Sequence, residues 1–400
     1  MLPRWSGILL VALVSGCGAP EPPASTGGTQ APPGACGRGL VVVSTDYLST
    51  NVSLVGIDGA VLSSSFISSA TVDAQLSAKL GGDVVAPTPL MAQSAIVLLD
   101  RYPSAVLTWI DVGSAKVEGQ LSVGPKTNPH DYLAIRGDKA YVTRLDRAAG
   151  VGSDLVVVDP SRLAAGGSIS LEVAMTGEPA ELGPAPHRLL RAGDAVVVTL
   201  LATSSDHQKS AASRLVELDP ETDGIDAVLV LDGLYECNGL ALGPDAKRVA
   251  LSCSGRFQGG SEPAVAESGI VVVELGPDPK EVLRIAAESA AFGFAVAWAG
   301  PHTLLANTFG AFADATSPER PDRVVEIDTE THATRTLIEA KAFTLGDLRC
   351  ATECKVCFAT DAAQGVLRRF EVDDDGHLQA PTSITVDTAI GLPPRALGQF

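Results

Sequence analysis

The feature that most constrains this chain is a unit of about 50 residues that recurs from residue 39 to the C-terminus. The clearest copy, Asn128 to Pro160, holds an apolar strand, a Gly-Asp turn, a second strand, a loop and a third strand. Apolar residues make up 46% of the chain but aromatic residues only 4%, and 40 glycines and 26 prolines imply frequent turns. We therefore predict an all-β fold of many short strands, with the repeated units packed side by side.

The repeat predicts a β-propeller of about seven four-stranded blades. Residues 39–67 supply only the second, third and fourth strands of one unit, and Pro394–Gly398 supplies a candidate for its inner strand. Pairing the C-terminal strand with the N-terminal strands would close the ring and leave no exposed sheet edge. The unequal unit lengths leave six or eight blades open. The remaining units begin near Val84, Asn128, Pro186, Asn238, Phe294 and Thr344.

Three units resemble the YVTN-type propeller repeat. The residues that carry the resemblance are Pro129-His130, Gly137–Thr143 and Leu155–Pro160 in one unit and Asn238–Val249 in another. In the spacing of strands and turns, the resemblance covers most of residues 39–400, and it implies the propeller fold. It implies no particular activity, because this repeat occurs in binding proteins, surface proteins and some enzymes.

Residues 1–16 are typical of a bacterial lipoprotein signal peptide. Arg4 precedes an apolar run at residues 7–14 that is too short to span a bilayer, and Val14–Cys17 resembles a lipobox. The resemblance implies that Cys17 carries lipid and anchors the mature chain to a membrane, while Gly18 after it favours the outer membrane of the cell envelope. An ordinary secretory signal with an incidental cysteine is the alternative.

The segment after the signal differs in composition from the rest. Residues 17–36 are rich in Pro, Gly, Ser and Thr, which predicts a disordered tether, and residues 37–400 are expected to form a single propeller domain. The chain carries 47 acidic residues against 29 Lys and Arg, a net charge of −18. Such a charge repels phosphate backbones, which excludes nucleic acid as a partner. We expect a monomer that binds an unidentified protein or small molecule.

The six cysteines after Cys17 predict disulfides, because the chain is expected to be exported. Cys237 and Cys253 lie symmetrically about one predicted hairpin turn and should face each other on neighbouring strands. Cys36 is expected on the same propeller face as the hairpin turn of the adjacent blade that begins at Cys350.

Two pairings are therefore open for Cys36, with Cys354 or with Cys350. We favour Cys36–Cys354 together with Cys350–Cys357. The spacing of Cys350, Cys354 and Cys357 is also that of radical SAM iron–sulfur proteins, but that family uses it in a cytosolic α/β barrel. Haem attachment is excluded because Phe358, not His, follows Cys357.

The starts of the inner strands are expected to ring the central channel. The loops between second and third strands should open on the same face, and four are long, at residues 145–154, 203–213, 254–268 and 309–322. Long loops on one face of a repeat fold typically mark the binding side. Alternatively, His130 and His187 are repeat residues that bond to backbone. The residues predicted at this rim are His130, His187, Asn238, Gly293, Asp347 and Arg395.

The leading functional interpretation is a binding or scaffold protein without catalysis and without a cofactor. The alternative is a hydrolase or lyase with its site on the axis. Similarity to calcium-dependent propeller lactonases would imply a calcium ion held by oxygen atoms of Asn238, Asn307, Asp347 and Glu236. A lyase would use His130 and His187. The run Asp373–Gly376 lacks the spaced ligands of a calcium loop and predicts a hairpin turn.

Overall fold

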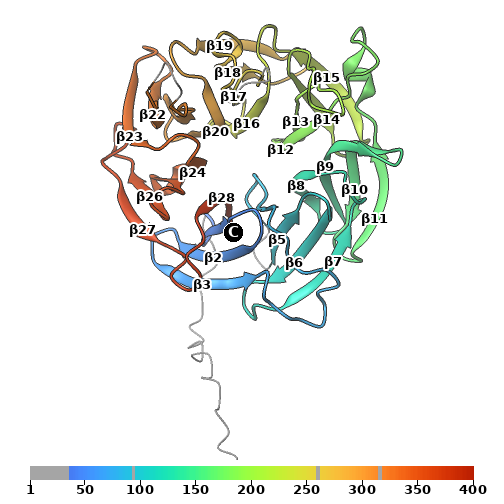
Figure 1. The fold of residues 1–400 in the computed structure, drawn as a ribbon. Coiled ribbons are helices and arrows are strands. Elements are labelled where there is room, and N and C mark those ends of the chain that lie inside the picture. The colour runs from blue at the N-terminus through green and yellow to red at the C-terminus, as the bar shows by residue number, and fades with distance from the viewer. Residues whose placement is uncertain (1–35, 92–94, 258–261, 314–317) are drawn as a thin grey trace, which may run out of the picture. The chain divides into compact units, whose positions relative to one another are not determined.

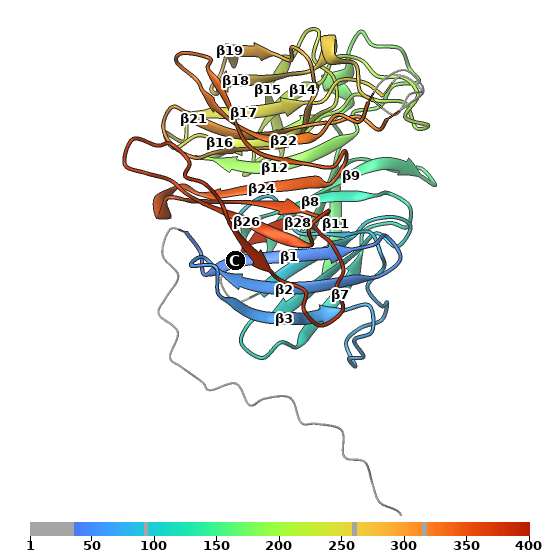
Figure 2. The same ribbon diagram turned by 60° about the vertical axis from the view of Figure 1, so that its left-hand side comes forward.

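The computed structural model describes residues 36–91, 95–257, 262–313 and 318–400. In this part of the chain the strands form seven four-stranded antiparallel sheets, arranged as the blades of a ring (Figure 1). Their innermost strands face the centre of the ring, and Figure 2 shows the blades from the side. The prediction of a seven-bladed β-propeller is confirmed.

The blades are numbered here in chain order, and the strands of each are given from the axis outward. Blade 1 is β28 (Pro394–Gln399), β1 (Gly39–Thr45), β2 (Thr50–Gly56) and β3 (Val61–Ser68); blade 2 is β4 (Val84–Val85), β5 (Ala95–Asp100), β6 (Val106–Asp111) and β7 (Val117–Ser122); blade 3 is β8 (Pro129–Arg136), β9 (Lys139–Ala148), β10 (Val151–Asp159) and β11 (Ala164–Ile169); blade 4 is β12 (Pro186–Ala192), β13 (Ala195–Leu200), β14 (Arg214–Asp219) and β15 (Gly224–Val230).

The other three blades have the same order. Blade 5 is β16 (Cys237–Leu242), β17 (Arg248–Cys253), β18 (Gly269–Glu274) and β19 (Lys280–Ala286); blade 6 is β20 (Phe292–Trp298), β21 (Thr303–Thr308), β22 (Asp322–Asp328) and β23 (Thr334–Ala340); blade 7 is β24 (Leu345–Ala351), β25 (Val356–Asp361), β26 (Val366–Glu371) and β27 (Thr382–Thr385). Three short 3-10 helices complete the described elements, η1 (Glu172–Met175), η2 (Val265–Glu267) and η3 (Thr352–Cys354).

The core lies between neighbouring blades, because each sheet packs both of its faces against other sheets. The second strand β1 is therefore apolar on consecutive residues, and all seven of its residues are buried. The outermost strand β19 alternates between exposed and partly buried residues, because one of its faces meets solvent. Small β-branched and aliphatic side chains suit such thin layers, which explains the low aromatic content.

The ring is closed by the two ends of the chain. β28 pairs with β1 in antiparallel register, with Leu397 opposite Val42, as the sequence predicted. The backbone N–H groups of Arg38 and Gly39 also donate to the carbonyl oxygen of Phe400. A disulfide between Cys36 and Cys354 adds a covalent link from the start of blade 1 to blade 7.

The structure contains three disulfides, which use all six cysteines of the propeller. Cys237–Cys253 links β16 to β17, and Cys350–Cys357 links β24 to β25. The third, Cys36–Cys354, is the pairing that the sequence favoured for Cys36. No cysteine of the described chain is therefore left as a thiolate for a metal cluster.

Three details differ from the sequence prediction. β4 has only two residues, and the segment after it, Ala86–Met91, leaves the blade for the axis. The predicted long loop 145–154 is mostly strand, because β9 and β10 extend to Ala148 and Val151. The strand β19 was not predicted from the sequence, because its charged and apolar residues alternate only weakly. The run Asp373–Gly376 forms a turn, as predicted.

The predicted leader, Cys17 and nearly all of the tether lie outside the described residues. Within the described part, no helix is long and apolar enough to cross a bilayer.

The closure of the ring predicts that the C-terminal strand is essential to stability. Removing residues 394–400 should lower the melting temperature strongly, because β1 loses its ladder partner and the fully buried Leu397 is lost. In the full-length chain, Leu397→Ala should cost about 2–5 kcal/mol of unfolding free energy. The exposed Thr382→Ala on β27 is the matched control and should cost little. Unchanged melting of the truncated chain would refute closure by β28.

Candidate functional site

A bulge in the inner strands of six blades sets the positions of the side chains that these strands direct to the axis. On β8, Pro129 pairs with Arg144 and Tyr132 with Val142, so the inner strand carries one extra residue. The hydroxyl of Thr143 on β9 accepts the freed backbone N–H of Asp131 at 2.8 Å. The same bond recurs in other blades, at 3.0 Å for Thr199 and Arg188, 3.1 Å for Asn307 and Ala295, and 2.9 Å for Thr360 and Asp347.

This repeated bond shows which rim residues are equivalent. Asp347 is equivalent to Asp131, not to His130, so the sequence prediction was one residue off in blade 7. In blade 6 the bulge holds two extra residues, and Gly293 accepts from Ser252 as His187 accepts from Thr143. The residues at the rim position in the blades that show the bulge are His130, His187, Asn238, Gly293 with Phe294, Gly346 and Arg395.

Asp131 and Asp347 join neighbouring blades. One carboxylate oxygen of Asp131 accepts the backbone N–H of Leu189 in blade 4 at 2.9 Å, and Asp347 accepts that of Leu397 in blade 1 at 3.0 Å. The other oxygen of Asp347 accepts Nη1 of Arg349 at 3.0 Å. Since these oxygens are already bonded within the protein, we assign both carboxylates a structural role.

A polar layer made by Thr88, Asp131 and Arg188 spans the axis. The backbone N–H of Thr88 donates to Asp131 at 2.8 Å, and Nη1 of Arg188 donates to the Thr88 hydroxyl at 3.1 Å. Nε of Arg188 also reaches the carbonyl oxygen of Asn238 at 3.2 Å. Burial raises the pKa of Asp131, an effect that the charge of Arg188 opposes. The layer thus connects blades 2 to 5 through side chains that the sequence places far apart.

His130 and His187 lie together in the rim, with their ring centroids 4.5 Å apart. Both are buried, and Nε2 of His130 and Nδ1 of His187 have no hydrogen-bond partner in the described part of the chain. Burial lowers the pKa of both imidazoles well below their usual value, and the nearby charges of Arg101 and Arg188 lower it further. Both rings are therefore neutral at pH 7 and are weak general bases.

Two of the four residues considered for calcium, Asn307 and Asp347, have their side-chain oxygens bonded within the protein. The side-chain amide of Asn307 accepts from the N–H of Ala295 and donates to the carbonyls of Leu345 and Gly346, and both oxygens of Asp347 are bonded within the protein. Burial raises the pKa of Glu236, which favours its neutral form over a charged ligand. Within residues 36–400, outside the three undescribed gaps, no group of three or more His, Cys, Asp or Glu could hold a metal ion.

A cluster of five phenylalanines covers part of the long-loop face beside the rim. Phe294 and Phe309 meet edge to face, with ring centroids 4.9 Å apart, and Phe312 is 57% exposed. Half of the ten phenylalanines in the chain lie here, although they come from separate loops and strands. Sequence reasoning missed the cluster. Its members are Phe257, Phe294, Phe309, Phe312 and Phe343.

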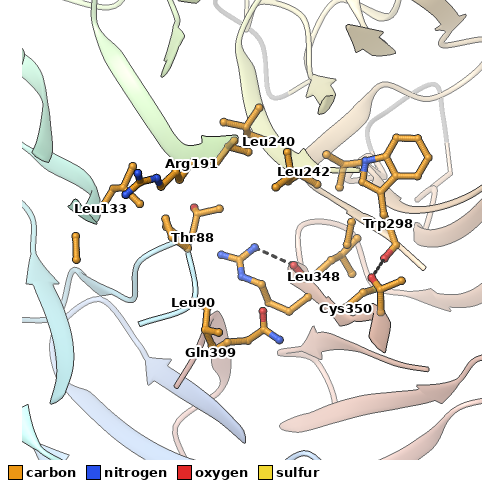
Figure 3. Close-up of a pocket in the computed structure, with 18 residues that line it drawn as sticks. Thr88, Leu90, Leu133, Arg191, Leu240, Leu242, Trp298, Leu348, Cys350 and Gln399 are labelled. Carbon is orange, nitrogen blue, oxygen red and sulfur yellow. Dashed lines mark hydrogen bonds between the residues drawn. The ribbon is translucent and has the colours of Figure 1, made fainter. Parts of the chain in front are cut away.

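A cavity of about 430 Å³ lies on the axis at the opposite mouth, beside the hairpin turns that follow the inner strands (Figure 3). All seven blades contribute to it. Most of the lining residues have apolar side chains, but Arg191, Arg349 and Gln399 also line it, and the segment after β4 adds Thr88 and Leu90. The predicted binding face, which carries the long loops, is thus not the face that holds this cavity. The apolar side chains labelled around it in Figure 3 include Leu133, Leu240, Leu242, Trp298 and Leu348.

Arg349 is the buried one of the two charged residues that line the cavity. It occupies the second position after the bulged residue of its strand, where other blades carry only apolar or small residues. A charged residue at a repeat position that is otherwise apolar or small can be recognised in a sequence. Here it could not be recognised, because the positions of the bulges must be known before the repeats can be aligned. The equivalent residues are Leu133, Leu190, Ala241, Ala297 and Gly398.

The structure is a seven-bladed β-propeller with a cavity on its axis, and comparisons with solved structures agree with the propeller fold. The chain is similar to a periplasmic gluconolactonase of Pseudomonas aeruginosa, with 12% identity, TM-score 0.52, and coverage of 90% of this chain and 98% of that one. It is also similar to the Swd1 β-propeller domain of Myceliophteria thermophila, with 8% identity, TM-score 0.54, and coverage of 84% and 98%.

A third similar structure is hydrazine synthase of Kuenenia stuttgartiensis, with 12% identity, TM-score 0.52, and coverage of 72% of this chain and 77% of that one. At these identities the likeness shows the fold alone. No protein-family model and no curated protein matches the chain.

The buried histidine pair predicts a loss of stability on acidification. Because the folded pKa of His130 and His187 lies below the unfolded value, the unfolded chain binds more protons as the pH falls through about 6.5. Between pH 7.5 and 5.5 each histidine should remove about 1.4 kcal/mol of unfolding free energy. His207 acts in the opposite sense, since its hydrogen bond with Asp146 raises its pKa.

The measurement is the pH dependence of denaturant unfolding. In the double variant His130→Gln, His187→Gln, the loss between pH 7.5 and 5.5 should shrink by about 2–3 kcal/mol. Gln208→Ala, on the exposed surface, changes no titratable group; it is the control and should leave the dependence unchanged. An identical pH dependence in wild type and the double variant would show that the pair is not buried in the neutral form.

Proposed function

We propose that the chain is an exported binding protein, anchored through Cys17 to the outer membrane of the cell envelope, that holds a small and mainly apolar molecule in the axial cavity without catalysis. The cavity carries this proposal. Its volume of about 430 Å³ lies in the range of small-molecule sites. A closed ring with a rigid wall from every blade also provides a site that is largely formed before the ligand binds.

The chemistry of the cavity favours binding over catalysis. Its lining consists of aliphatic side chains, Trp298 and a few polar groups, and includes no His, Asp or Glu. Hydrolysis or elimination requires a group that moves a proton or an ion that activates water. The titratable residues of the axis, His130, His187 and Asp131, lie instead in the rim and in the polar layer. A hydrolase or lyase remains the alternative.

A neutral apolar probe tests the cavity. N-phenyl-1-naphthylamine should bind with one-to-one stoichiometry and quench the fluorescence of Trp298, and this quenching should be absent in Trp298→Phe. Ala134→Phe adds a ring at the cavity wall and should weaken binding at least about tenfold, or ~1.4 kcal/mol. Ala164→Phe, on the exposed outer strand β11, is the matched control and should bind as the wild type does.

The result of this binding experiment distinguishes a binding protein from a hydrolase. Absence of saturable binding, or equal binding by wild type and Ala134→Phe, would sink the proposal that the axial cavity is the site. Turnover of an ester or lactone by the purified protein, abolished by Ala134→Phe but not by Ala164→Phe, would favour the hydrolase instead.

The membrane anchor has its own test. In cells, Cys17→Ala should release the protein from the membrane fraction, because the acyl chains supply the membrane affinity. Ser25→Ala in the tether is the control and should leave the protein in that fraction. Continued membrane association of Cys17→Ala, with correct export, would count against lipidation.

A further inference from the structure

The guanidinium group of Arg349 indicates which class of small molecule the cavity binds, an inference that rests on the proposed function. Arg349 is 9% exposed and lines the cavity from β24. Its Nη1 donates to Asp347 at 3.0 Å and to the carbonyl oxygen of Leu348 at 2.9 Å. Its Nε and Nη2 are buried and have no hydrogen-bond partner in the described part of the chain.

These two nitrogens form one edge of the planar guanidinium. The N–H bonds of Nε and Nη2 are parallel, and their spacing matches the two oxygens of a carboxylate. The interaction with Asp347 orients the group through the opposite nitrogen, while this buried edge has no hydrogen-bond partner in the described part of the chain. A buried donor without a partner is costly, so a ligand that accepts both hydrogen bonds gains more here than at an exposed arginine.

The charges around the cavity also favour an anion. Two arginines, Arg191 and Arg349, line it, and no acidic side chain does, although the chain has 47 acidic residues against 29 Lys and Arg. Arg188 of the polar layer adjoins the cavity, and its positive charge and that of Arg349 repel each other. Asp131 and Asp347 are acids whose charges act on Arg188, and Asp347 also forms an ion pair with Arg349. The side chains that line the cavity thus include two cations and no acid, although acidic residues outnumber basic ones in the chain.

The walls define the rest of the ligand. Leu133 and Leu190 face the cavity from blades 3 and 4, and Leu240 and Val296 face it from blades 5 and 6. We propose that the cavity binds a monocarboxylate with an aliphatic or aromatic body, with its carboxylate on Nε and Nη2 of Arg349 and its body against these side chains. Lysine could not replace this arginine, because an ammonium group does not present two parallel donors.

Three ligands with the same chain and different head groups test the proposal: octanoate, 1-octanol and octylamine, each measured by displacement of N-phenyl-1-naphthylamine. Octanoate should displace the probe at a concentration about 10- to 100-fold lower than 1-octanol, the gain expected from hydrogen bonds to a charged group. Octylamine should be the weakest of the three, because its charge repels Arg191 and Arg349.

Variants locate the effect. Arg349→Met should reduce the affinity for octanoate to that for 1-octanol. The affinities for 1-octanol and the probe should stay as in the wild type, and this unchanged binding also shows that the variant is folded. Arg349→Lys keeps the charge and should still lose most of the preference for octanoate. Arg136→Met is the matched control and should retain the preference, since the Arg136 side chain is exposed, pairs with Asp138 and does not line the cavity.

Each failure has a distinct meaning. Equal binding of octanoate and 1-octanol to the wild type would overturn the carboxylate inference and leave the binding function standing. An octanoate preference that survives in Arg349→Met would overturn the role of Arg349. Failure of the probe and of all three ligands to bind would overturn the proposed function itself.

Discussion

The pairing of β28 with β1 is the interaction on which the rest of the structure depends. A propeller has an axis only if its first and last blades meet, and here one blade is built from both ends of the chain. The Cys36–Cys354 disulfide and the bond from Asp347 to the N–H of Leu397 strengthen that joint from two sides. Without it, the walls of the axial cavity would be free to separate, because neighbouring blades are held mainly by packing.

The bulge in the inner strands determines which side chains lie at each depth along the axis of the ring. It places three layers along the axis: the rim with His130 and His187, the polar layer with Arg188, and the cavity with Arg349. Many of the titratable groups on the axis are neutral, buried histidines or carboxylates bonded within the protein. We assign these groups a structural role. The free edge of Arg349 is different, because its hydrogen-bonding capacity is not used within the described chain.

Low sequence identity to solved propellers of unrelated activity gives the fold and no function. The functional argument therefore rests on the site alone. An apolar cavity with one buried, half-satisfied arginine is specific enough to name a ligand class and to be tested by exchanging a head group. The phenylalanine cluster on the other face shows that a second surface of this propeller departs from its average composition, since half of the chain's phenylalanines gather there.

The sequence by itself determined the class of fold and the Cys237–Cys253 pair, because strand period, turn residues and hairpin symmetry are local properties. Pro394–Gly398 was a candidate for the closing strand because the first unit lacks its inner strand, and two partners were open for Cys36. The sequence did not determine the site. It assigned Asp347 to the rim position that His130 occupies in its blade, one residue off, since bulges shift the register without a clear local signal. The expectation that the long-loop face binds a partner stays a prediction. Only the tertiary structure decided that Arg349 from blade 7 stands among leucines of blades 3 to 5. Residues so far apart in sequence become neighbours only when the ring closes.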